Sequence, residues 1–382
     1  MMTMTSPLNS ADMERYARHL ALPEFGIAAQ GRLKSAHILV VGAGGLGAAA
    51  LPYLAGAGIG AITICDDDMV SLSNLHRQTI YTAAQGVAGD WAKADAAAAY
   101  MAALNPDIAI HVIKSRFDED FAGGHRYDLI LDGSDNFKTK TALNLYALRH
   151  QTPLISASVN QFQGQCGVFA GHEADAPCYH CLFPELPHNA RNCNEAGVLG
   201  TAAGLTGLYQ AHLAILYLAA LETDMKDNVP QSIGAGYFLS LDFKTMRNSV
   251  LRVPKNSDCN VCKDYIVSQP AQAAQIAQAT DKNTRHNIKK DRPTMIELLS
   301  LQDLQNQDHI IVDVRTPPEL SDDPIAGALH IELKEIPARY HELPQDKLLA
   351  FVCAGNVRSR QAAEYLAALG FDNVAVLDKF SL

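Results

Sequence analysis

The sequence predicts an α/β fold divided into two domains, and three observations support this prediction. The chain has 382 residues, 48% of them hydrophobic, which is more than a single core usually holds. Apolar strands alternate with helical segments, an order that favours sheets with parallel strands. After Val267 comes a stretch rich in glutamine, alanine and charge that has no clear apolar face. We therefore expect a first domain over residues 1–267, a linker over 268–292 and a smaller α/β domain over 293–382.

A glycine-rich turn between a strand and a helix organises the first domain. An apolar strand at 38–41 leads into a turn with glycines at 42, 44, 45 and 47, and a helix at 48–57 and a second strand at 61–65 follow before Asp66. The first glycine permits the tight turn, the second lets the backbone approach a phosphate, and the third lets helix and strand pack closely. This order predicts a Rossmann-like sheet that binds phosphate at the helix N-terminus and a ribose hydroxyl at Asp66. The turn alone suits NAD, FAD or ATP, so the nucleotide stays open at this point.

Two polar side chains beyond the second strand favour ATP. Asn74 and Arg77 lie just past the C-terminal end of that strand, where open α/β sheets bind ligands. A guanidinium there suits a polyphosphate that gains negative charge during a reaction. An arginine on such a loop is by itself more often a solvated surface residue. The combination with the glycine turn favours the polyphosphate.

Acidic residues follow a further expected strand at 127–132. Asp132 and Asp135 therefore lie on the ligand side of the sheet. One of the two carboxylates can hold Mg²⁺, which prefers oxygen ligands and shares its shell with substrate phosphates. The alternative is that Ser134 and Asp135 cap the helix that starts near Phe137. The neighbouring charged residues favour the ligand interpretation.

Two CxxC pairs give the sequence its sharpest metal signal. In a chain without secretory features, two such pairs indicate a tetrahedral site of four thiolates with no open position, which is structural rather than catalytic. We expect a zinc ion there that clips the end of the first domain onto its middle. A redox-active disulfide pair and unrelated buried thiols are the alternatives. The four cysteines are Cys178, Cys181, Cys259 and Cys262, and we leave His180 out of the set.

The charge and the hydropathy pattern argue against two classes of partner. A formal charge of −10 argues against nucleic acid. No basic and apolar leader opens the chain, so we expect a cytoplasmic protein. The apolar run at 201–221 is long enough to span a membrane, but it carries Gly204, Gly207, Gln210 and His212 on a helical pattern. A buried core helix explains this run better, and we expect no membrane partner.

The second domain places a cysteine at the end of a strand. Buried strands are expected at 309–315 and 347–353, and the second runs into a loop from Cys353 to Arg358 before a helix at 360–369. The inward-facing amides of such a loop, the positive helix terminus and the adjacent guanidinium stabilise an anionic sulfur adduct. A phosphate-binding cysteine loop has similar features, and a purely structural cysteine is the other alternative.

Taken together, the motifs of the first domain resemble those of the MoeB/ThiF family, the bacterial relatives of ubiquitin-activating enzymes. The match covers about residues 10–265. Besides the CxxC pairs, it rests on Glu14-Arg-Tyr-x-Arg18, Gly42-x-Gly-Gly-Leu-Gly47, Ser73-Asn-Leu-x-Arg-Gln78, Asp132-x-x-Asp-Asn136 and Cys193-x-x-x-Gly-Val-Leu-Gly200. The resemblance implies adenylation, with ATP and Mg²⁺, of the C-terminal glycine of a small ubiquitin-like sulfur-carrier protein ending in Gly-Gly.

The same resemblance implies roles for individual residues. Arg77 and Asp135 are the expected catalytic groups of the adenylation. Arg18 reaches the nucleotide of a neighbouring subunit in this family, so we expect a homodimer, and Cys193 matches the family's reactive cysteine. The residues expected to bind ATP and magnesium are Gly42, Gly44, Gly45, Asp66, Asn74, Arg77, Lys93, Asp135 and Asn136.

The second domain resembles a rhodanese domain, on the strength of the strand Asp313-Val-Arg315 and the loop from Cys353 to Arg358. The resemblance implies that Cys353 holds a persulfide, supplied by a cysteine desulfurase or another sulfur donor. In the expected path this persulfide attacks the acyl-adenylate, and Cys193 then releases a thiocarboxylate and leaves a Cys193–Cys353 disulfide. The expected fold is thus a Rossmann-like adenylating domain with a mixed sheet and a four-cysteine zinc site, followed by a rhodanese-like domain.

Two other functions compete with this one. An NAD-dependent oxidoreductase with an accessory thiol domain uses the same glycine turn, but it gives no role to Arg77, Asp135 or the four cysteines. A binding scaffold without activity has no need of an intact Arg77, Asp135 and Cys353. The pathway also stays open, because molybdopterin synthesis, thiamine synthesis, tRNA thiolation and thiolated secondary metabolites all use this chemistry.

Overall fold

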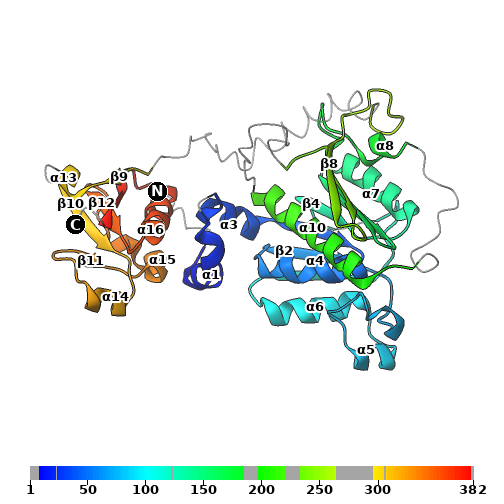
Figure 1. Cartoon of the computed structure of the whole chain (residues 1–382), viewed down its shortest axis with the longest axis horizontal. Coiled ribbons are helices and arrows are strands. Elements are labelled where there is room, and N and C mark those ends of the chain that lie inside the picture. Colours follow the sequence, from blue (N-terminus) through cyan, green and yellow to red (C-terminus); the bar gives the residue numbers. More distant parts are fainter. Residues whose placement is uncertain are drawn as a thin grey trace. The chain divides into compact units, whose positions relative to one another are not determined.

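The computed structural model of the chain describes residues 8–22, 24–121, 124–184, 197–219, 233–263, 296–304 and 307–379. Its contacts divide the chain into two compact units, each an α/β structure (Figure 1). The larger unit is Ser35–Arg285, and the smaller unit combines Met1–Lys34 with His286–Leu382. The domain boundaries expected from the sequence stay a prediction, and they differ from this division in where they assign the first 34 residues.

The larger unit contains a mixed sheet, as the sequence predicts, and this sheet has eight strands. The strand order is β3-β2-β1-β4-β5-β6-β7-β8. The strands from β3 to β5 pair in parallel, whereas β5, β6, β7 and β8 pair antiparallel. The strands are His37–Val41 (β1), Ala61–Cys65 (β2), Ala109–Ile113 (β3), Leu129–Asp132 (β4), Leu154–Asn160 (β5), Gln163–Phe169 (β6), Tyr237–Asp242 (β7) and Arg247–Arg252 (β8).

Helices cover both faces of this sheet. Helix α7 (Phe137–Arg149) packs on the face that presents Leu39, Val41 and Ile130. On the other face α4 (Gly45–Gly56) lies between α6 (Lys93–Leu104) and α10 (Gly200–Ala219) (Figure 1). Among the described residues, only α10 is long and apolar enough to cross a membrane. It packs against α4, β5 and β6, as expected for a core helix. The shorter helices are η1 (Leu72–Asn74), α5 (Ala83–Ala88) and α8 (Tyr179–Leu182).

The turn between β1 and α4 requires glycine at two positions. Gly42 has a φ of 93°, and a Cβ there would lie 2.9 Å from the carbonyl oxygen of Gly133. A Cβ on Gly47 would lie 2.0 Å from the carbonyl oxygen of Gly42. Strand and helix therefore approach each other as closely as they do only because these residues lack side chains. Helix α4 begins at Gly45, three residues before the expected start, so its first free amides belong to the turn itself.

The smaller unit contains a five-stranded parallel sheet of order β11-β10-β12-β13-β9. Its strands β10 and β12 are the two that the sequence predicts. Cys353 follows β12 directly, and α16 (Val357–Ala368) begins after the loop. The strands are Leu298–Leu299 (β9), His309–Asp313 (β10), Leu329–His330 (β11), Leu348–Val352 (β12) and Val374–Leu377 (β13). The other C-terminal helices are Leu301–Leu304 (α13), Pro317–Asp322 (α14), Leu333–Glu335 (η2), Ile336–Arg339 (α15) and Tyr340–Glu342 (η3).

Three N-terminal helices belong to the smaller unit. Met13, Tyr16 and Leu20 are at most 4% exposed and share an apolar core with Ile336 and Tyr365. A break at Tyr16 divides this segment into two helices, whose apolar side is buried while Arg15 and Arg18 are exposed. The helices are Ser10–Arg15 (α1), Ala17–Leu20 (α2) and Gly26–Ser35 (α3).

Candidate nucleotide, metal and sulfur sites

A cavity of about 520 Å³ lies at the C-terminal edge of the parallel strands of the larger unit. It is within the size range of sites that enclose small ligands. The glycine turn, the segment after β2, the start of α6 and the turn before α7 together form its wall. The structure thus brings together the predicted nucleotide-binding residues of this unit, namely Gly42, Gly44, Gly45, Asp66, Asn74, Arg77, Lys93, Asp135 and Asn136.

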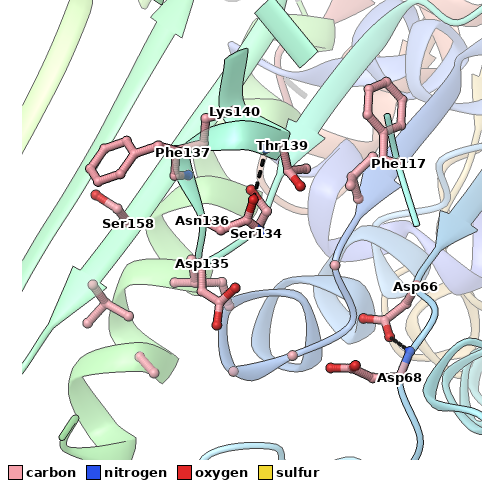
Figure 2. A pocket seen from close by; sticks show the side chains of 18 of the residues that line it. Asp66, Asp68, Phe117, Ser134, Asp135, Asn136, Phe137, Thr139, Lys140 and Ser158 are labelled. Carbon is pink, nitrogen blue, oxygen red and sulfur yellow. Dashed lines mark hydrogen bonds between the residues drawn. The ribbon is translucent and has the colours of Figure 1, made fainter. Parts of the chain in front are cut away.

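Asp66 is a buried acid held by backbone amides. Its two carboxylate oxygens accept hydrogen bonds from the amide of Ala43 at 2.7 Å and from the amide of Asp68 at 2.8 Å, the second of which is drawn in Figure 2. Burial raises the pKa of Asp66 above its ordinary value of 3.8, although Lys93 and the two amides act in the opposite direction. The position at the end of β2 is the one at which an acid contacts a ribose in this type of sheet.

Two of the cationic side chains that line the cavity, Lys93 and Arg77, are predicted ATP contacts. Lys93 opens α6, and its Nζ lies 2.6 Å from Oδ2 of Asp68, with the lysine side chain 5% exposed. Arg77 follows η1, and its aliphatic stem lies against the glycine turn, because a Cβ on Gly45 would lie 3.4 Å from Cδ of Arg77. Arg77 therefore lies beside the N-terminus of α4, and Lys93 lines the same cavity, so that both charges favour bound phosphate.

The turn after β4 separates the two acids that the sequence leaves as alternatives. Asp132 is fully buried and its oxygens accept four hydrogen bonds: from the amide and hydroxyl of Ser134, from Ser156 Oγ at 2.6 Å and from Lys140 Nζ at 2.7 Å. Asp135 is exposed, has no side-chain partner among the described residues, and directs its carboxylate into the cavity toward the side where Asp66 and Asp68 lie (Figure 2). Asp135 is thus the acid that is available to a ligand.

The capping alternative for Ser134 and Asp135 is wrong. Asn136 caps α7, and its Oδ1 accepts the amide hydrogen of Thr139 at 2.9 Å. Asn136 also lines the cavity, so one residue both starts the helix and contributes to the predicted site. Asp135 is left without a structural role in the cap.

The two CxxC pairs form one cluster in the larger unit. Their four Sγ atoms all lie within 4.8 Å of one another, and the pairs Cys178–Cys259, Cys178–Cys181 and Cys181–Cys262 are 3.7, 3.9 and 3.6 Å apart. Tetrahedral zinc with Zn–S bonds of about 2.3 Å places its sulfurs about 3.8 Å apart, so the donor set fits zinc. Burial raises the pKa of Cys262 to about 12 and that of Cys178 further, so a cation is needed to hold these groups as thiolates. His180 lies outside the cluster, with its Nδ1 3.1 Å from Nδ2 of Asn144.

The loop after β12 surrounds the sulfur of Cys353 with helix-terminal groups. The amide of Ser359, in the first turn of α16, lies 3.3 Å from Sγ, and Ser359 Oγ is also 3.3 Å away. Arg358 makes a bidentate ion pair with Glu319 of α14, at 2.5 and 2.7 Å. This pair holds the pKa of Glu319 far below its usual range. Cys353 is only 1% exposed, so the loop holds the thiol beneath its surface.

Comparison with known proteins identifies the family. A profile of the ThiF family matches residues 16–261, and one of the rhodanese-like domain matches residues 297–380. The chain belongs to the ThiF family. The protein named adenylyltransferase and sulfurtransferase MOCS3 of Aedes aegypti is 36% identical to it over 377 residues, which are 95% of this chain and 78% of that protein. The SAMP-activating enzyme E1 of Haloferax volcanii is 37% identical over 266 residues, which are 68% of this chain and 92% of that enzyme.

Solved structures show the same fold for this ThiF-family protein. The crystal structure of Escherichia coli MccB with ATP has a TM-score of 0.55 at 18% identity, and the similarity covers 65% of this chain and 74% of that chain. The structure of MccB with MccA-N7isoASN has a TM-score of 0.56 at 17% identity. At these identities the likeness establishes the fold alone.

One residue predicted to reach the nucleotide, Arg18, is not among those that line the cavity. Arg18 is exposed on α2, in the smaller unit. Cys193 lies outside the described residues. The role of Arg18 toward a neighbouring subunit and the role of Cys193 in releasing the product stay predictions.

Sequence analysis did not identify Lys140, which stabilises the turn after β4 through its contact with the buried Asp132. Its Nζ contacts Oδ2 of Asp132 and the carbonyl oxygen of Ala157 at 2.8 Å, and thereby joins α7, β4 and β5. One signal was available, because Lys140 lies one helical turn after the cap at Asn136, on the side of α7 that faces the sheet. Lysine is rarely buried, so its presence in a helix does not predict burial. The acid that pairs with Lys140 lies on another element and can be identified only from the folded structure.

Proposed function

We propose that this ThiF-family protein uses ATP and Mg²⁺ to adenylate the C-terminal glycine of a small ubiquitin-like sulfur-carrier protein, and then transfers sulfur to it to give a thiocarboxylate. The cavity carries this proposal, because at the ligand edge of one sheet it joins free helix amides, the cations Arg77 and Lys93, and the carboxylate of Asp135, which has no partner among the described residues. The same chain holds a cysteine at the end of a rhodanese-like strand. The relatives named adenylyltransferase and sulfurtransferase, and SAMP-activating enzyme E1, favour this function over an NAD-dependent oxidoreductase or an inactive scaffold.

In the proposed first step the carrier's terminal carboxylate attacks the α-phosphorus of ATP. The bond to the β-phosphate breaks, pyrophosphate leaves and an acyl-adenylate forms. The attack builds negative charge on the phosphate chain, which Arg77, Lys93 and the free amides of α4 are placed to stabilise. Asp135 and Asn136 supply oxygen atoms to hold Mg²⁺, which would neutralise part of the phosphate charge. Asp66 binds the ribose and fixes the nucleotide's orientation.

In the proposed second step the outer sulfur of a Cys353 persulfide attacks the acyl carbon, and AMP leaves. The thiolate of Cys193 then attacks Sγ of Cys353, and the carrier departs as a thiocarboxylate with the transferred sulfur. The products are a Cys193–Cys353 disulfide and the thiocarboxylate, so a dithiol reductant must restore both cysteines before the next cycle. A cysteine desulfurase or another protein persulfide supplies the sulfur to Cys353.

The proposal also includes the metal, the cellular compartment and the oligomeric state of the enzyme. The four-cysteine cluster holds structural zinc, since all four ligand positions are filled by thiolates. The enzyme works in the cytoplasm, where unpaired cysteines stay reduced, and it acts as a homodimer in which Arg18 reaches the partner's nucleotide. Neither nucleic acid nor a membrane has a part in the reaction.

Replacing Cys353 by alanine tests the division of labour between the two units. ATP–pyrophosphate exchange in the presence of a carrier protein is expected to continue at the wild-type rate, because no group of the cavity changes. Thiocarboxylate formation, followed by mass spectrometry of the carrier, is expected to stop. Cys166→Ala is the matched control, since Cys166 is also buried and contributes to neither site. Loss of both activities in the Cys353→Ala enzyme would refute the proposed division.

A further inference from the structure

We propose that the side-chain amide of Gln78 is a further nucleotide-binding group that contacts the phosphate chain beside the glycine turn. The inference rests on the proposed use of ATP in this cavity. It adds a contact made by a neutral amide to those of the two cations and the helix terminus.

The first observation is an amide that is buried with one end unpaired. Gln78 is 3% exposed, and its Oε1 has no hydrogen-bond partner among the described residues. Most buried polar atoms in folded proteins are paired, because an unpaired one loses its hydrogen bonds to water without replacement. Oε1 is an acceptor and cannot pair with phosphate oxygens, so its lack of a donor shows that no described protein group fixes the amide at this end, and the N–H end is the one that can meet a phosphate. Gln78 nevertheless lines the cavity, so a ligand can reach part of this side chain.

The second observation is the place where the amide lies. A Cβ built on Gly44 would be 3.6 Å from Nε2 of Gln78, so the amide faces the turn with room for only a small group between them. Gly44 is the N-cap of α4, a helix of 12 residues with no side-chain cap. The first amides of this helix have no intrahelical partner and attract an anion. A glutamine N–H at this distance from the turn is positioned to donate to the same phosphate.

A backbone hydrogen bond fixes Gln78 in the same turn as the predicted ATP-binding residues Asn74 and Arg77. Its amide nitrogen donates to the carbonyl oxygen of Asn74 at 3.0 Å, in the same short turn that presents Arg77. Arg77 faces Gly45 and Gln78 faces Gly44, so consecutive side chains approach consecutive residues of the glycine turn. The geometry places the cation and the amide side by side at the helix terminus. This arrangement suits a phosphate chain, which needs both charge and hydrogen-bond donors.

The test uses Gln78→Leu in the full chain, with nucleotide titrated calorimetrically in the absence of carrier so that ATP is not consumed. ATP is expected to bind about 10-fold or more weakly, since a hydrogen bond to a charged group is lost. Adenosine, which has no phosphate, is expected to bind as it does to the wild type. The thermal midpoint is expected to stay the same or rise, because the variant removes a buried acceptor that has no partner.

The matched control is Gln361→Leu in α16 of the smaller unit. Gln361 is 5% exposed and its Nε2 has no partner among the described residues, so this variant removes a comparable amide far along the chain from the cavity. It is expected to leave both nucleotide affinities unchanged. A second variant, Gln78→Glu, keeps the shape and adds a negative charge, and it should weaken ATP more than Gln78→Leu does while sparing adenosine.

Two results would overturn the inference. One is an unchanged ATP affinity in either folded Gln78 variant. The other is an equal loss for ATP and adenosine, which would mean that the substitution distorts the whole cavity. Failure of the wild-type protein to bind ATP, or to release pyrophosphate with a carrier, would instead refute the proposed function, so the two failures are distinguishable.

Discussion

At the scale of single residues, two acids three positions apart have opposite environments. Asp132 is buried under four hydrogen bonds, whereas Asp135 points into the cavity without a partner among the described residues. The sequence places both at the end of one strand and does not separate them. The difference comes from Lys140 and Ser156, which approach from another helix and another strand. Local sequence therefore located the acids, and tertiary contacts assigned them their roles.

Substituting each acid by its amide is expected to separate stability from activity. Asp132→Asn leaves the buried Lys140 without a charge partner, and it should lower the free energy of unfolding by about 3–5 kcal/mol. Asp135→Asn removes an unpaired carboxylate, and it should leave stability unchanged while lowering pyrophosphate exchange by about 100-fold. Denaturant titration and the exchange assay measure the two effects. The assignment fails if Asp135→Asn is the less stable variant or retains full exchange.

The raised pKa of Asp66 predicts a pH dependence of nucleotide binding. The ionised carboxylate is the better acceptor for ribose hydroxyls, and burial holds its pKa above the ordinary 3.8. As the pH falls through this raised pKa, the carboxylate gains a proton and the affinity for ATP is expected to decrease, starting at a higher pH than for a solvated aspartate. Titrations with ATP and adenosine should both show the decrease, because the ribose is common to them. Asp66→Asn is the control, and its affinity should not follow this titration.

At the scale of secondary-structure elements, the sequence predicted the parallel part of the fold better than the rest. Buried strands such as β1 and β2 are continuous apolar runs, and the glycine turn marks the start of the helix that comes after β1. Strand β8 has no such signal, because all six of its residues are exposed and its place comes only from pairing with β7. The break between α1 and α2 at Tyr16 has no local signal for a similar reason, since the burial of that side chain depends on residues far along the chain.

The cysteine cluster predicts that metal removal destabilises the larger unit. The clip joins α8 to the segment after β8, and these lie about eighty residues apart in the chain. A strong chelator, or Cys262→Ser, is expected to lower the thermal midpoint by about 10 °C or more, because metal binding contributes directly to folding. Elemental analysis of the purified protein should find zinc in proportion to chain, and the amount should fall in Cys262→Ser but not in Cys166→Ala. A zinc-free protein with the same midpoint would refute the structural role.

At the scale of the whole molecule, the smaller unit is assembled from both ends of the chain. Helices α1 to α3 and the C-terminal sheet share one apolar core, and Asp12 and Lys34 form an ion pair between α1 and α3. Helix α3 ends at Ser35 and β1 of the larger unit begins at His37, so the chain passes between the units through one residue. Sequence patterns are local and do not reveal which of two domains a distant helix packs on. The N-terminal helices were therefore assigned to the first domain, because the motif that ends at Arg18 resembles part of an ATP site.

This arrangement predicts that the N-terminal helices stabilise the sulfur-transfer unit. Met13→Ala or Leu20→Ala opens a cavity in the shared core and is expected to lower the stability of the smaller unit by about 2–5 kcal/mol. The chain has a single tryptophan, Trp91, which belongs to the larger unit, so its fluorescence reports that unit alone. The circular-dichroism transition should therefore begin at a lower temperature, while the Trp91 transition stays in place.

Alkylation of Cys353 gives a second readout of the smaller unit. The thiol is nearly inaccessible in the folded state, so its labelling rate should rise in Met13→Ala as local opening becomes more frequent. Glu14→Ala is the matched control, because Glu14 is exposed on the same helix and should change neither the transition nor the labelling rate. If Met13→Ala instead shifts the Trp91 transition and leaves Cys353 protected, the N-terminal helices stabilise the nucleotide-binding unit and the composite assembly is wrong.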